Sequence, residues 1–314
     1  MRVLHVSQTD YLGGAAIAAY RIHKALIDIE NINSLMCCDI HHSTSYNERL
    51  PSWKYIKIES AVRKKIDHGL KRLMPTEFNT SSINIIPSSW LKKINDHNPD
   101  VVHLHRLGGQ MLSINQIAKI KAPVVWTLHD YWALNGISHL SQNDAENNTD
   151  LYIRAWLQID QLLERYKKSL FFGKIKAFVV PSSFAKKTLI DKYDINPGSI
   201  KVIPIPVPDI DIKAPVFSRS SIRRFTILYS AIAADLDKNK GLDDFIKALQ
   251  IVNCELADLN IEINVCLVGF DAPDLTFDKL NIDCRGYIED TDELFEIYKQ
   301  ADICVMPSLN ETFG

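Results

Sequence analysis

The fold is decided by the last stretch of the chain, Ala301-Asp-Ile-Cys-Val-Met-Pro-Ser-Leu-Asn-Glu-Thr-Phe-Gly314. Residues 303–306 are apolar and predict a short buried strand, which Pro307 ends because proline cannot donate to a strand ladder. A polar turn with Glu311 follows, and Gly314 occupies the position at which a helix would begin. α/β proteins bind ligands in such loops, at the carboxyl ends of their strands. We therefore expect a ligand site around Glu311.

The residues before this stretch repeat the order of strand, loop and helix. An apolar strand is predicted over 225–230, a loop over 231–240, a helix from Gly241 and a second strand over 263–268. Lys240 ends that loop directly before the helix, where an ammonium group and free helix amides together would meet a phosphate. A surface lysine that merely precedes a helix is the alternative interpretation.

Strands and helices also alternate in the first two thirds of the chain. Apolar strands are predicted over 3–7, 34–38, 101–105, 123–129, 177–180 and 200–203. This alternation predicts parallel, doubly wound sheets of the α/β class. A proline-rich stretch without periodicity then reads as a linker. We expect two doubly wound, Rossmann-like domains that face a cleft: an N-terminal domain over 1–205, a linker over 206–220 and a C-terminal domain over 221–314.

Composition limits the classes of function. The 314 residues carry a net charge of −2, which gives no overall indication of a nucleic-acid partner. The six cysteines form no C-x-x-C pair, so reduced thiols are favoured over a metal site or disulfides. No apolar run reaches the ~18 residues of a membrane span, and no signal segment precedes the first strand. A cytoplasmic protein is therefore expected.

Residues 53–74 form a basic amphipathic segment. Its apolar residues keep helical spacing, and lysines and arginines fill much of the rest; the apolar set is Ile58, Val62, Ile66, Leu70 and Leu73. Such a helix can lie on an anionic membrane, here the inner face of the plasma membrane. A helix that packs on its domain and has a solvated outer face is the alternative, and the sequence leaves both open.

Polar residues follow two strands of the first domain. Gly13 and Gly14 separate the first strand from a helix, where glycines permit close backbone approach and leave helix amides free for an anion. A tight turn without function is the alternative. His129 and Asp130 end an otherwise apolar strand and are expected to face the cleft.

Two further histidines lie in the strand over 101–105. His103 and His105 alternate with apolar residues and therefore share one face of the strand. We interpret them as packed or hydrogen-bonded structural residues. Two histidines can bind a metal, but the sequence offers no third ligand at a strong spacing.

The terminal motif Pro307-Ser-Leu-Asn-Glu-Thr-Phe-Gly314 resembles the donor-site signature of retaining GT-B glycosyltransferases (group 1, family 4). This family includes glycogen synthases and bacterial polysaccharide mannosyl- and glucosyltransferases. The resemblance covers essentially the whole chain, through Tyr298-Lys-Gln-Ala-Asp302, Lys240-Gly241, Val180-Pro-Ser-Ser183, His129-Asp130 and Gly13-Gly14. It implies a hexosyltransferase that builds a bacterial surface glycan, such as exopolysaccharide or lipopolysaccharide.

The resemblance also implies that the domain over 1–205 is the acceptor-side domain and that the domain over 221–314 is the nucleotide-sugar donor domain. Lys240 would contact the diphosphate of a nucleoside-diphosphate sugar, and Glu311 would hold the hydroxyls of the donor sugar. The backbone amides of Thr312, Phe313 and Gly314 would lie along that sugar.

In the first domain, the resemblance implies that Gly13 and Gly14 let their loop approach the diphosphate. His129 would lie beside the sugar at the reacting carbon, so His129 and Glu311 are the implied catalytic residues. Transfer would retain the anomeric configuration without a metal or other cofactor. The implied partners are the nucleotide-sugar donor and a glycan or lipid-linked acceptor.

Three positions depart from the family pattern. Ala234 stands where relatives carry an arginine on the diphosphate, and no cysteine follows the His-Asp-x-Trp segment. The second glutamate of the family, eight positions after Glu311 and on the ribose, would fall beyond residue 314. We therefore expect a C-terminally truncated donor domain, and little or no transfer by the 314-residue chain.

Two other functions are kept as alternatives. A non-catalytic, glycosyltransferase-like sugar-nucleotide binder or partner subunit would explain Ala234 and the missing second glutamate. A nucleotide-sugar 2-epimerase shares the two-domain cleft, although the Lys240-Gly241 and Glu311-Thr-Phe-Gly patterns disfavour it.

Overall fold

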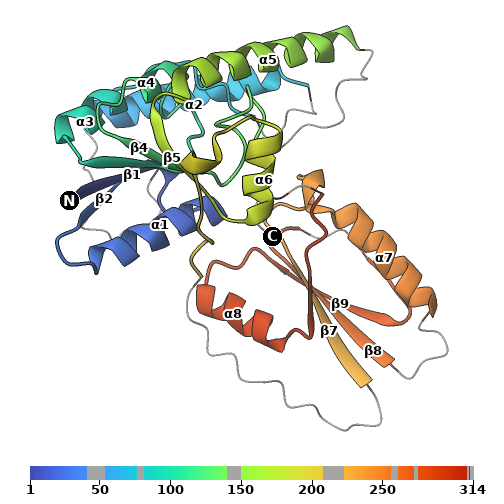
Figure 1. The fold of residues 1–314 in the computed structure, drawn as a ribbon. Helices are drawn as coiled ribbons and strands as arrows, with labels where there is room; N and C mark the ends of the chain where they lie inside the picture. The colour runs from blue at the N-terminus through green and yellow to red at the C-terminus, as the bar shows by residue number, and fades with distance from the viewer. Residues whose placement is uncertain are drawn as a thin grey trace. The chain divides into compact units, whose positions relative to one another are not determined.

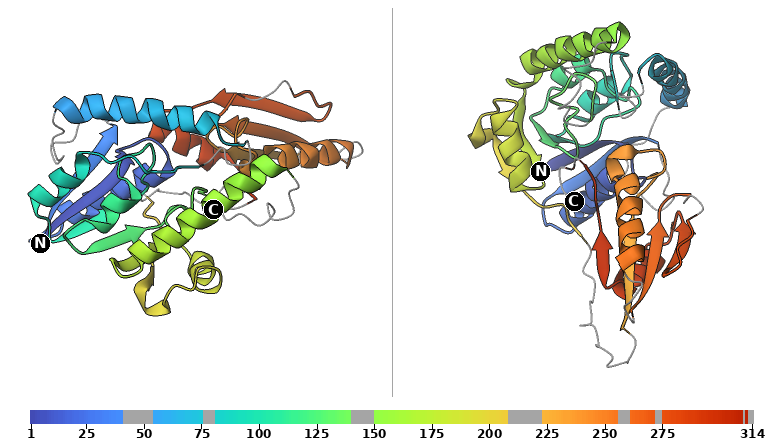
Figure 2. Two further views of the ribbon diagram at one scale, coloured as in Figure 1. Left: turned by 90° about the horizontal axis from the view of Figure 1, so that it is seen from above. Right: turned by 90° about the vertical axis from the view of Figure 1, so that its right-hand side faces the viewer.

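The computed structural model describes residues 1–40, 54–75, 81–139, 150–207, 223–255, 261–271, 275–309 and 311. The chain divides into two compact units, the first formed by Met1–Val207 and the second by most of the remaining residues. Figures 1 and 2 draw both units. Of the predicted linker over 206–220, only residues 206 and 207 lie among the described residues.

The first unit is built on a parallel sheet with the strand order β2-β1-β3-β4-β5-β6. Its strands are β1 (Arg2–Thr9), β2 (Asn33–Ile40), β3 (Val101–Leu104), β4 (Val124–Thr127), β5 (Ile175–Val180) and β6 (Ile200–Val202). Nearly continuous apolar runs suit such a sheet because helices cover both of its faces. The strand order reverses between β1 and β3, and open α/β sheets bind ligands at this switch point.

Helices lie on both faces of this sheet (Figure 1). They are α1 (Gly14–Ile27), α2 (Lys54–Arg72), α3 (Trp90–His97), α4 (Ile114–Ala118), α5 (Leu151–Phe171) and α6 (Ser183–Asp191). The main core lies on the face that α2 to α6 cover. There, Leu4 and Val6 of β1 and Leu104 of β3 pack with apolar residues of those helices.

Helix α1 is the described helix that packs on the opposite face of the sheet. Its Ala19 contacts Met36 and Cys38 of β2 in a separate small cluster. Because side chains alternate along a strand, the neighbours of Leu4, Val6 and Leu104 must point to this second face. This alternation places a set of polar residues under α1, described below.

The second unit contains a smaller parallel sheet with the order β10-β7-β8-β9. Its elements are β7 (Arg223–Ser230), α7 (Leu242–Glu255), β8 (Ile261–Val268), β9 (Leu280–Gly286), α8 (Thr291–Gln300) and β10 (Ile303–Val305). Asp290 caps α8, since its carboxylate accepts hydrogen bonds from the amides of Asp292 and Glu293. The prediction of two doubly wound, Rossmann-like α/β units is confirmed.

The prediction that residues 303–306 form a buried strand is wrong. Among the described residues, strand β10 lies at the edge of the sheet and pairs with β7, and Ile303 is 50% exposed. The apolar sequence therefore identified the strand but not its position. An edge strand has a neighbour on one side only, so it cannot be buried like a central one.

Helix α2 turns a different side to its domain from the one the sequence suggested. The residues it buries are Ile56, Ser60, Arg63 and Asp67. Arg63 forms an ion pair with Asp39 of β2 at 3.3 Å, which compensates its burial. None of the described helices is both long enough and apolar enough to span a membrane.

The predicted apolar stripe of α2 lies mainly on its exposed side. Ile58, Val62, Ile66 and Leu73 are each 44–69% exposed. Only Leu70 packs against a neighbouring cluster. The helix thus packs on its domain through a side other than this stripe, and four of the five stripe residues lie on its exposed side.

Candidate functional site

Lys240 lies in the loop between β7 and α7 of the second unit. A short 3-10 helix, Lys238–Lys240, ends this loop and is capped by Asp237, whose carboxylate accepts from the amide of Asn239 at 3.1 Å. The Tyr229 hydroxyl donates to the backbone carbonyl of Lys240 at 2.9 Å. Burial raises the pKa of Tyr229 to about 12, so this hydroxyl stays protonated. These contacts fix the backbone of Lys240, while its side chain is 29% exposed.

Glu311 lies beside this lysine. Its Oε1 is 2.9 Å from Nζ of Lys240. Strands β7 and β10 are parallel neighbours, so the loops that follow them emerge at one edge of the sheet. The amide of Leu309 joins the two loops, since it donates to the carbonyl of Asn239 at 2.9 Å. The structure thus brings together the predicted lysine and carboxylate of the donor domain.

Gly241 permits this close approach of the two loops. Its φ of +68° lies in the left-handed region, and a Cβ at this position would collide with the backbone carbonyl of Pro307. Glycine is thus required here for both conformation and space. Thr312, Phe313 and Gly314 lie outside the described residues, and their role along the sugar stays a prediction.

Replacing Gly241 by alanine should lower the free energy of unfolding by about 1–3 kcal/mol and loosen the contact between the two loops. Chemical denaturation measures the first effect. Gly173→Ala is the matched control, because a Cβ at Gly173 meets no atom within 4 Å. Equal stability of the two variants would contradict this role of Gly241.

Ala234 lies in the core of the second unit. It is 4% exposed and packs in the cluster that contains Tyr229 and Phe245. An arginine on this backbone would bury its guanidinium among apolar side chains, which is costly without a partner. The arginine that the family resemblance places at this position would therefore require a different arrangement of this loop.

The Gly13-Gly14 pair lies at the beginning of α1. Gly13 has φ 85° and ψ 157°, a conformation that is essentially confined to glycine, and α1 begins at Gly14. No atom lies within 4 Å of a Cβ built on either glycine. The loop thus has the open surface that close ligand approach requires, and its role at the diphosphate stays a prediction.

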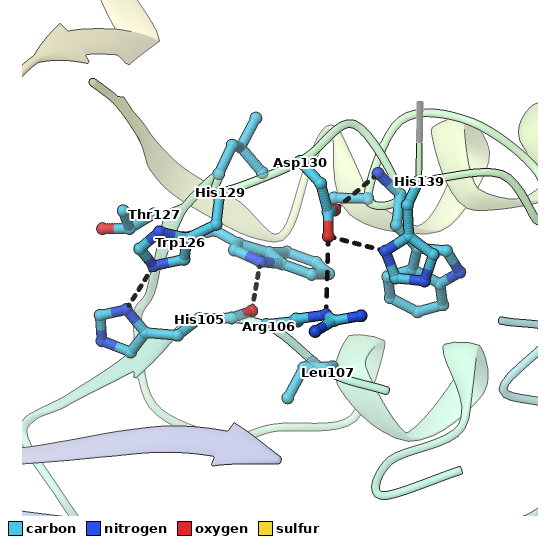
Figure 3. Close-up of a pocket in the computed structure, with 11 residues that line it drawn as sticks. His105, Arg106, Leu107, Trp126, Thr127, His129, Asp130 and His139 are labelled. Atoms are coloured by element: carbon cyan, nitrogen blue, oxygen red, sulfur yellow. Dashed lines mark hydrogen bonds and ion pairs between the residues drawn. The ribbon is translucent and has the colours of Figure 1, made fainter. Parts of the chain in front are cut away.

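His129 and Asp130 follow β4 at the same edge of the first sheet. Asp130 is held by the Nδ1 of His139 at 2.6 Å, by the amide of Trp132 at 3.0 Å and by Arg106 at 4.0 Å (Figure 3). Burial opposes ionisation, but His139 and Arg106 outweigh it and hold the pKa of Asp130 well below its usual range. The carboxylate therefore anchors the loop that follows His129.

Lys167 of α5 holds the loop that follows His129 through contacts with its backbone. Its buried Nζ donates to the carbonyls of Trp132 at 2.6 Å and Asn135 at 2.9 Å, and lies 3.6 Å from the centroid of the Trp132 ring. Burial lowers the pKa of Lys167 well below its usual value, although Asp160 opposes this. The sequence did not single out this residue, because a lysine within a helix gives no sign of burial.

His129 is also bonded to a buried group of histidines. Its Nε2 lies 3.2 Å from Nδ1 of His105 (Figure 3). His105 and His103 are hydrogen-bonded as predicted, the latter to Thr127 at 2.7 Å. The sequence analysis missed His5, which β1 places opposite His103 in the pairing of β1 with β3. A buried polar residue in an apolar strand was its only signal.

Two hollows differ in their relation to these residues. A cavity of about 10 Å³ adjoins His129 and Asp130 and has room for at most one water molecule. A hollow of about 280 Å³ lies over the sheet of the second unit and is lined by Thr226, Asn264 and Asp283, among others. These residues do not lie in the loops at the carboxyl ends of the strands, so the larger hollow is not the candidate site.

The two loops of the second unit offer complementary chemistry to a ligand. The ammonium of Lys240 suits a phosphate, and the carboxylate of Glu311 accepts hydrogen bonds from hydroxyl groups. A sugar phosphate carries both kinds of group. Two parallel α/β units with such residues at their strand ends are the features by which this chain resembles the GT-B glycosyltransferases.

Comparison with known proteins agrees with this class. Residues 12–209 match the family model described as Glycosyltransferase Family 4, and residues 225–314 match that of Glycosyl transferases group 1. The chain therefore belongs to Glycosyltransferase Family 4. The prediction of a group 1 glycosyltransferase is confirmed. No curated protein matches the sequence.

Solved structures share the fold at low sequence identity. HepE from Anabaena in complex with UDP-glucose superposes with a TM-score of 0.53 and 14% identity, over 98% of this chain and 74% of that one. WaaG, a glycosyltransferase involved in lipopolysaccharide biosynthesis, gives a TM-score of 0.52 and 14% identity, over 99% and 76%. At this identity the likeness establishes the GT-B fold.

Proposed function

We propose that this glycosyltransferase moves a hexose from a nucleoside-diphosphate sugar to a glycan or lipid-linked acceptor, with retention of the anomeric configuration and without a metal ion. The observation that carries the proposal is the pairing of Lys240 with Glu311 at 2.9 Å, at the ends of neighbouring strands. These two residues belong to the motifs on which the family resemblance rests. Both side chains are about 30% exposed, so a ligand can reach them.

In the proposed reaction, this chain's part is mainly electrostatic. Lys240 lies against the diphosphate and neutralises the negative charge that develops as the bond to the anomeric carbon loosens. Glu311 accepts hydrogen bonds from the sugar hydroxyls and fixes the sugar. The acceptor hydroxyl then attacks from the face that the diphosphate leaves, and the departing diphosphate takes the hydroxyl proton.

The names of similar structures suggest where to begin the search for substrates. HepE was solved with UDP-glucose, and WaaG is described as acting in lipopolysaccharide biosynthesis. We propose, by analogy with these proteins, a role in building a bacterial surface polysaccharide. Uridine-diphosphate sugars are accordingly the first donors to test, followed by guanosine-diphosphate sugars.

The experiment is a donor screen with two readouts on the same protein. Calorimetry measures binding of each nucleotide sugar, and release of nucleoside diphosphate in the presence of glycan acceptors measures transfer. We expect binding, transfer that is slow in the 314-residue chain and persists in EDTA, and a product whose anomeric configuration matches the donor. Binding without transfer would favour a non-catalytic sugar-nucleotide binder, and epimerised sugar without any acceptor would favour a 2-epimerase.

We also propose that α2 contacts an anionic membrane surface and brings the enzyme to a lipid-linked acceptor at the inner face of the plasma membrane. The exposed apolar residues Ile58, Val62 and Ile66 follow one another by about one turn along one side of the helix. Lys57 and Lys65 are exposed on an adjoining side. An apolar stripe beside a basic one is the pattern of helices that lie in a membrane interface.

Vesicle co-sedimentation tests this surface. The native chain should sediment with vesicles that contain phosphatidylglycerol and far less with pure phosphatidylcholine, because basic residues add electrostatic attraction to apolar burial. Changing Ile58, Val62 and Ile66 together to serine should abolish most binding. Ile251→Ser is the control, since Ile251 is 60% exposed on α7. Binding that survives the triple change would rule out α2 as the contact.

A further inference from the structure

A row of polar side chains lies beneath α1, on the face of the first sheet opposite the main core. His5 is fully buried, as is His105, and His103 lies beside them. The ring centroids of His103 and His105 are 4.3 Å apart, and those of His5 and His103 are 5.0 Å apart. These residues are at the point where the strand order reverses, between β1 and β3.

Three of the histidines form a hydrogen-bonded chain that leads to the candidate site. Nδ1 of His5 lies 3.1 Å from Nε2 of His105, and Nδ1 of His105 lies 3.2 Å from Nε2 of His129. The chain thus runs from the interior under α1 to the loop after β4. His129 is the residue that the family resemblance places beside the donor sugar.

The rings of this chain are neutral at physiological pH. Burial, with the mutual proximity of the rings, lowers the pKa of His5 and of His105 well below the usual value. Burial, with Arg106 nearby, lowers the pKa of His129 to about 4, although Asp130 opposes this. A neutral imidazole carries one N–H, so each ring in the chain is a donor at one nitrogen and an acceptor at the other. The protons must therefore all point in the same direction along the chain.

His5, at the buried end of the hydrogen-bonded row of histidines, determines the direction in which the protons point. Nε2 of His5 is buried and has no hydrogen-bond partner among the described residues. A proton there would leave a buried N–H unsatisfied, and orphaned buried N–H groups are rarer in proteins than under-satisfied acceptors. The proton of His5 therefore lies on Nδ1, that of His105 lies on Nδ1, and Nε2 of His129 accepts.

A metal ion is the competing explanation for the cluster. His5, His103 and His105 each offer one nitrogen, and the three nitrogens lie within 4.8 Å of one another. Ligands of a tetrahedral zinc ion bound at 2.0–2.1 Å are only about 3.3–3.4 Å apart. The Nδ1 atom of His5 and both nitrogens of His105 are already engaged in the hydrogen-bonded chain. The hydrogen-bonded chain therefore accounts for this geometry better than a metal site does.

We propose that His5 and His105 are positioning residues that fix the tautomer of His129, so that His129 carries its proton on Nδ1 and acts as a neutral hydrogen-bond donor. This role in transfer rests on the proposed function. The assigned tautomer itself does not. Experiments can therefore contradict the assigned tautomer and the proposed function independently of each other.

Long-range proton–nitrogen correlation spectra of the ligand-free native protein test the tautomer directly. We expect His5, His105 and His129 all to carry their protons on Nδ1. A proton on Nε2 of His129 would overturn the proposal. Stoichiometric zinc binding by the native protein that His5→Gln abolishes would overturn it as well.

Two variants separate positioning from packing. His105→Phe keeps the ring volume but removes the donor to His129, and should reduce kcat about tenfold with little change in KM, the loss of roughly one hydrogen bond. His105→Asn places an amide near the original Nδ1 and should recover most of that loss. His97→Asn is the control, because His97 lies on α3 and outside the hydrogen-bonded row of histidines. Equal kcat in the His105→Phe variant and the native enzyme would overturn the positioning role.

Discussion

Lys240→Met should reduce kcat/KM for transfer by about 100- to 1000-fold, the usual result of removing one group that stabilises developing negative charge. Glu311→Gln should fall in a similar range, because the amide cannot replace the carboxylate as an acceptor for two hydroxyls. Initial rates of nucleoside-diphosphate release measure both effects. Donor affinity by calorimetry gives a second measurement that does not depend on turnover.

Protein stability should hardly change in these two variants. The side chains of Lys240 and Glu311 are 29% and 30% exposed, and ion pairs at such positions contribute about 0–1 kcal/mol. A loss of activity with an unchanged melting temperature would therefore locate the effect in ligand contacts. Lys238→Met, in the same short 3-10 helix, is the matched control. A Lys240→Met enzyme that retains native kcat/KM would contradict the assigned role.

The second large effect is a loss of stability in mild acid. The pKa of His103 and that of His129 are lowered to about 4, chiefly by burial, whereas the unfolded rings titrate near 6.5. Between these values the unfolded chain binds more protons, so the free energy of unfolding falls as the pH falls from about 6.5 to 4. Each of the two rings accounts for about 3 kcal/mol of this loss of folding free energy, at about 1.4 kcal/mol for each pKa unit.

Denaturation at a series of pH values measures the slope of the free energy of unfolding against pH. His103→Phe should flatten it by about one proton between pH 6.5 and 4, because one titrating ring is removed. His68→Asn, at an exposed position of α2, is the control variant. Asp130, whose pKa is held below its usual range, contributes only in stronger acid, below about pH 4. A native protein equally stable at pH 7 and pH 4.5 would contradict buried, neutral histidines.

The order of the elements was readable from the sequence because it depends on local patterns. Apolar runs alternating with helical spacing identify β1, β4 and β7. The loops at strand ends follow from this order. Lys240 and Glu311 could therefore be selected as candidates, although they are far apart in the chain.

Burial was the property that the sequence predicted least well. The stripe at Ile58 and Ile66 keeps helical spacing, yet α2 buries its polar side, where Arg63 finds Asp39 as an ionic partner. Strand β10 is apolar and yet exposed at a sheet edge. In both elements the neighbours decide which face is covered, and neighbours come from distant parts of the chain.

The sequence by itself determined the class of fold, the GT-B family resemblance and the candidate residues at the strand ends, because periodicity and motifs are local properties of the chain. Only the tertiary structure decided which of these residues meet. It placed Glu311 against Lys240, and it joined His5 and His105 to His129 through neighbouring strands. Strand order sets such contacts, and strand order follows from the packing of whole helices on a sheet, which no short stretch of sequence encodes.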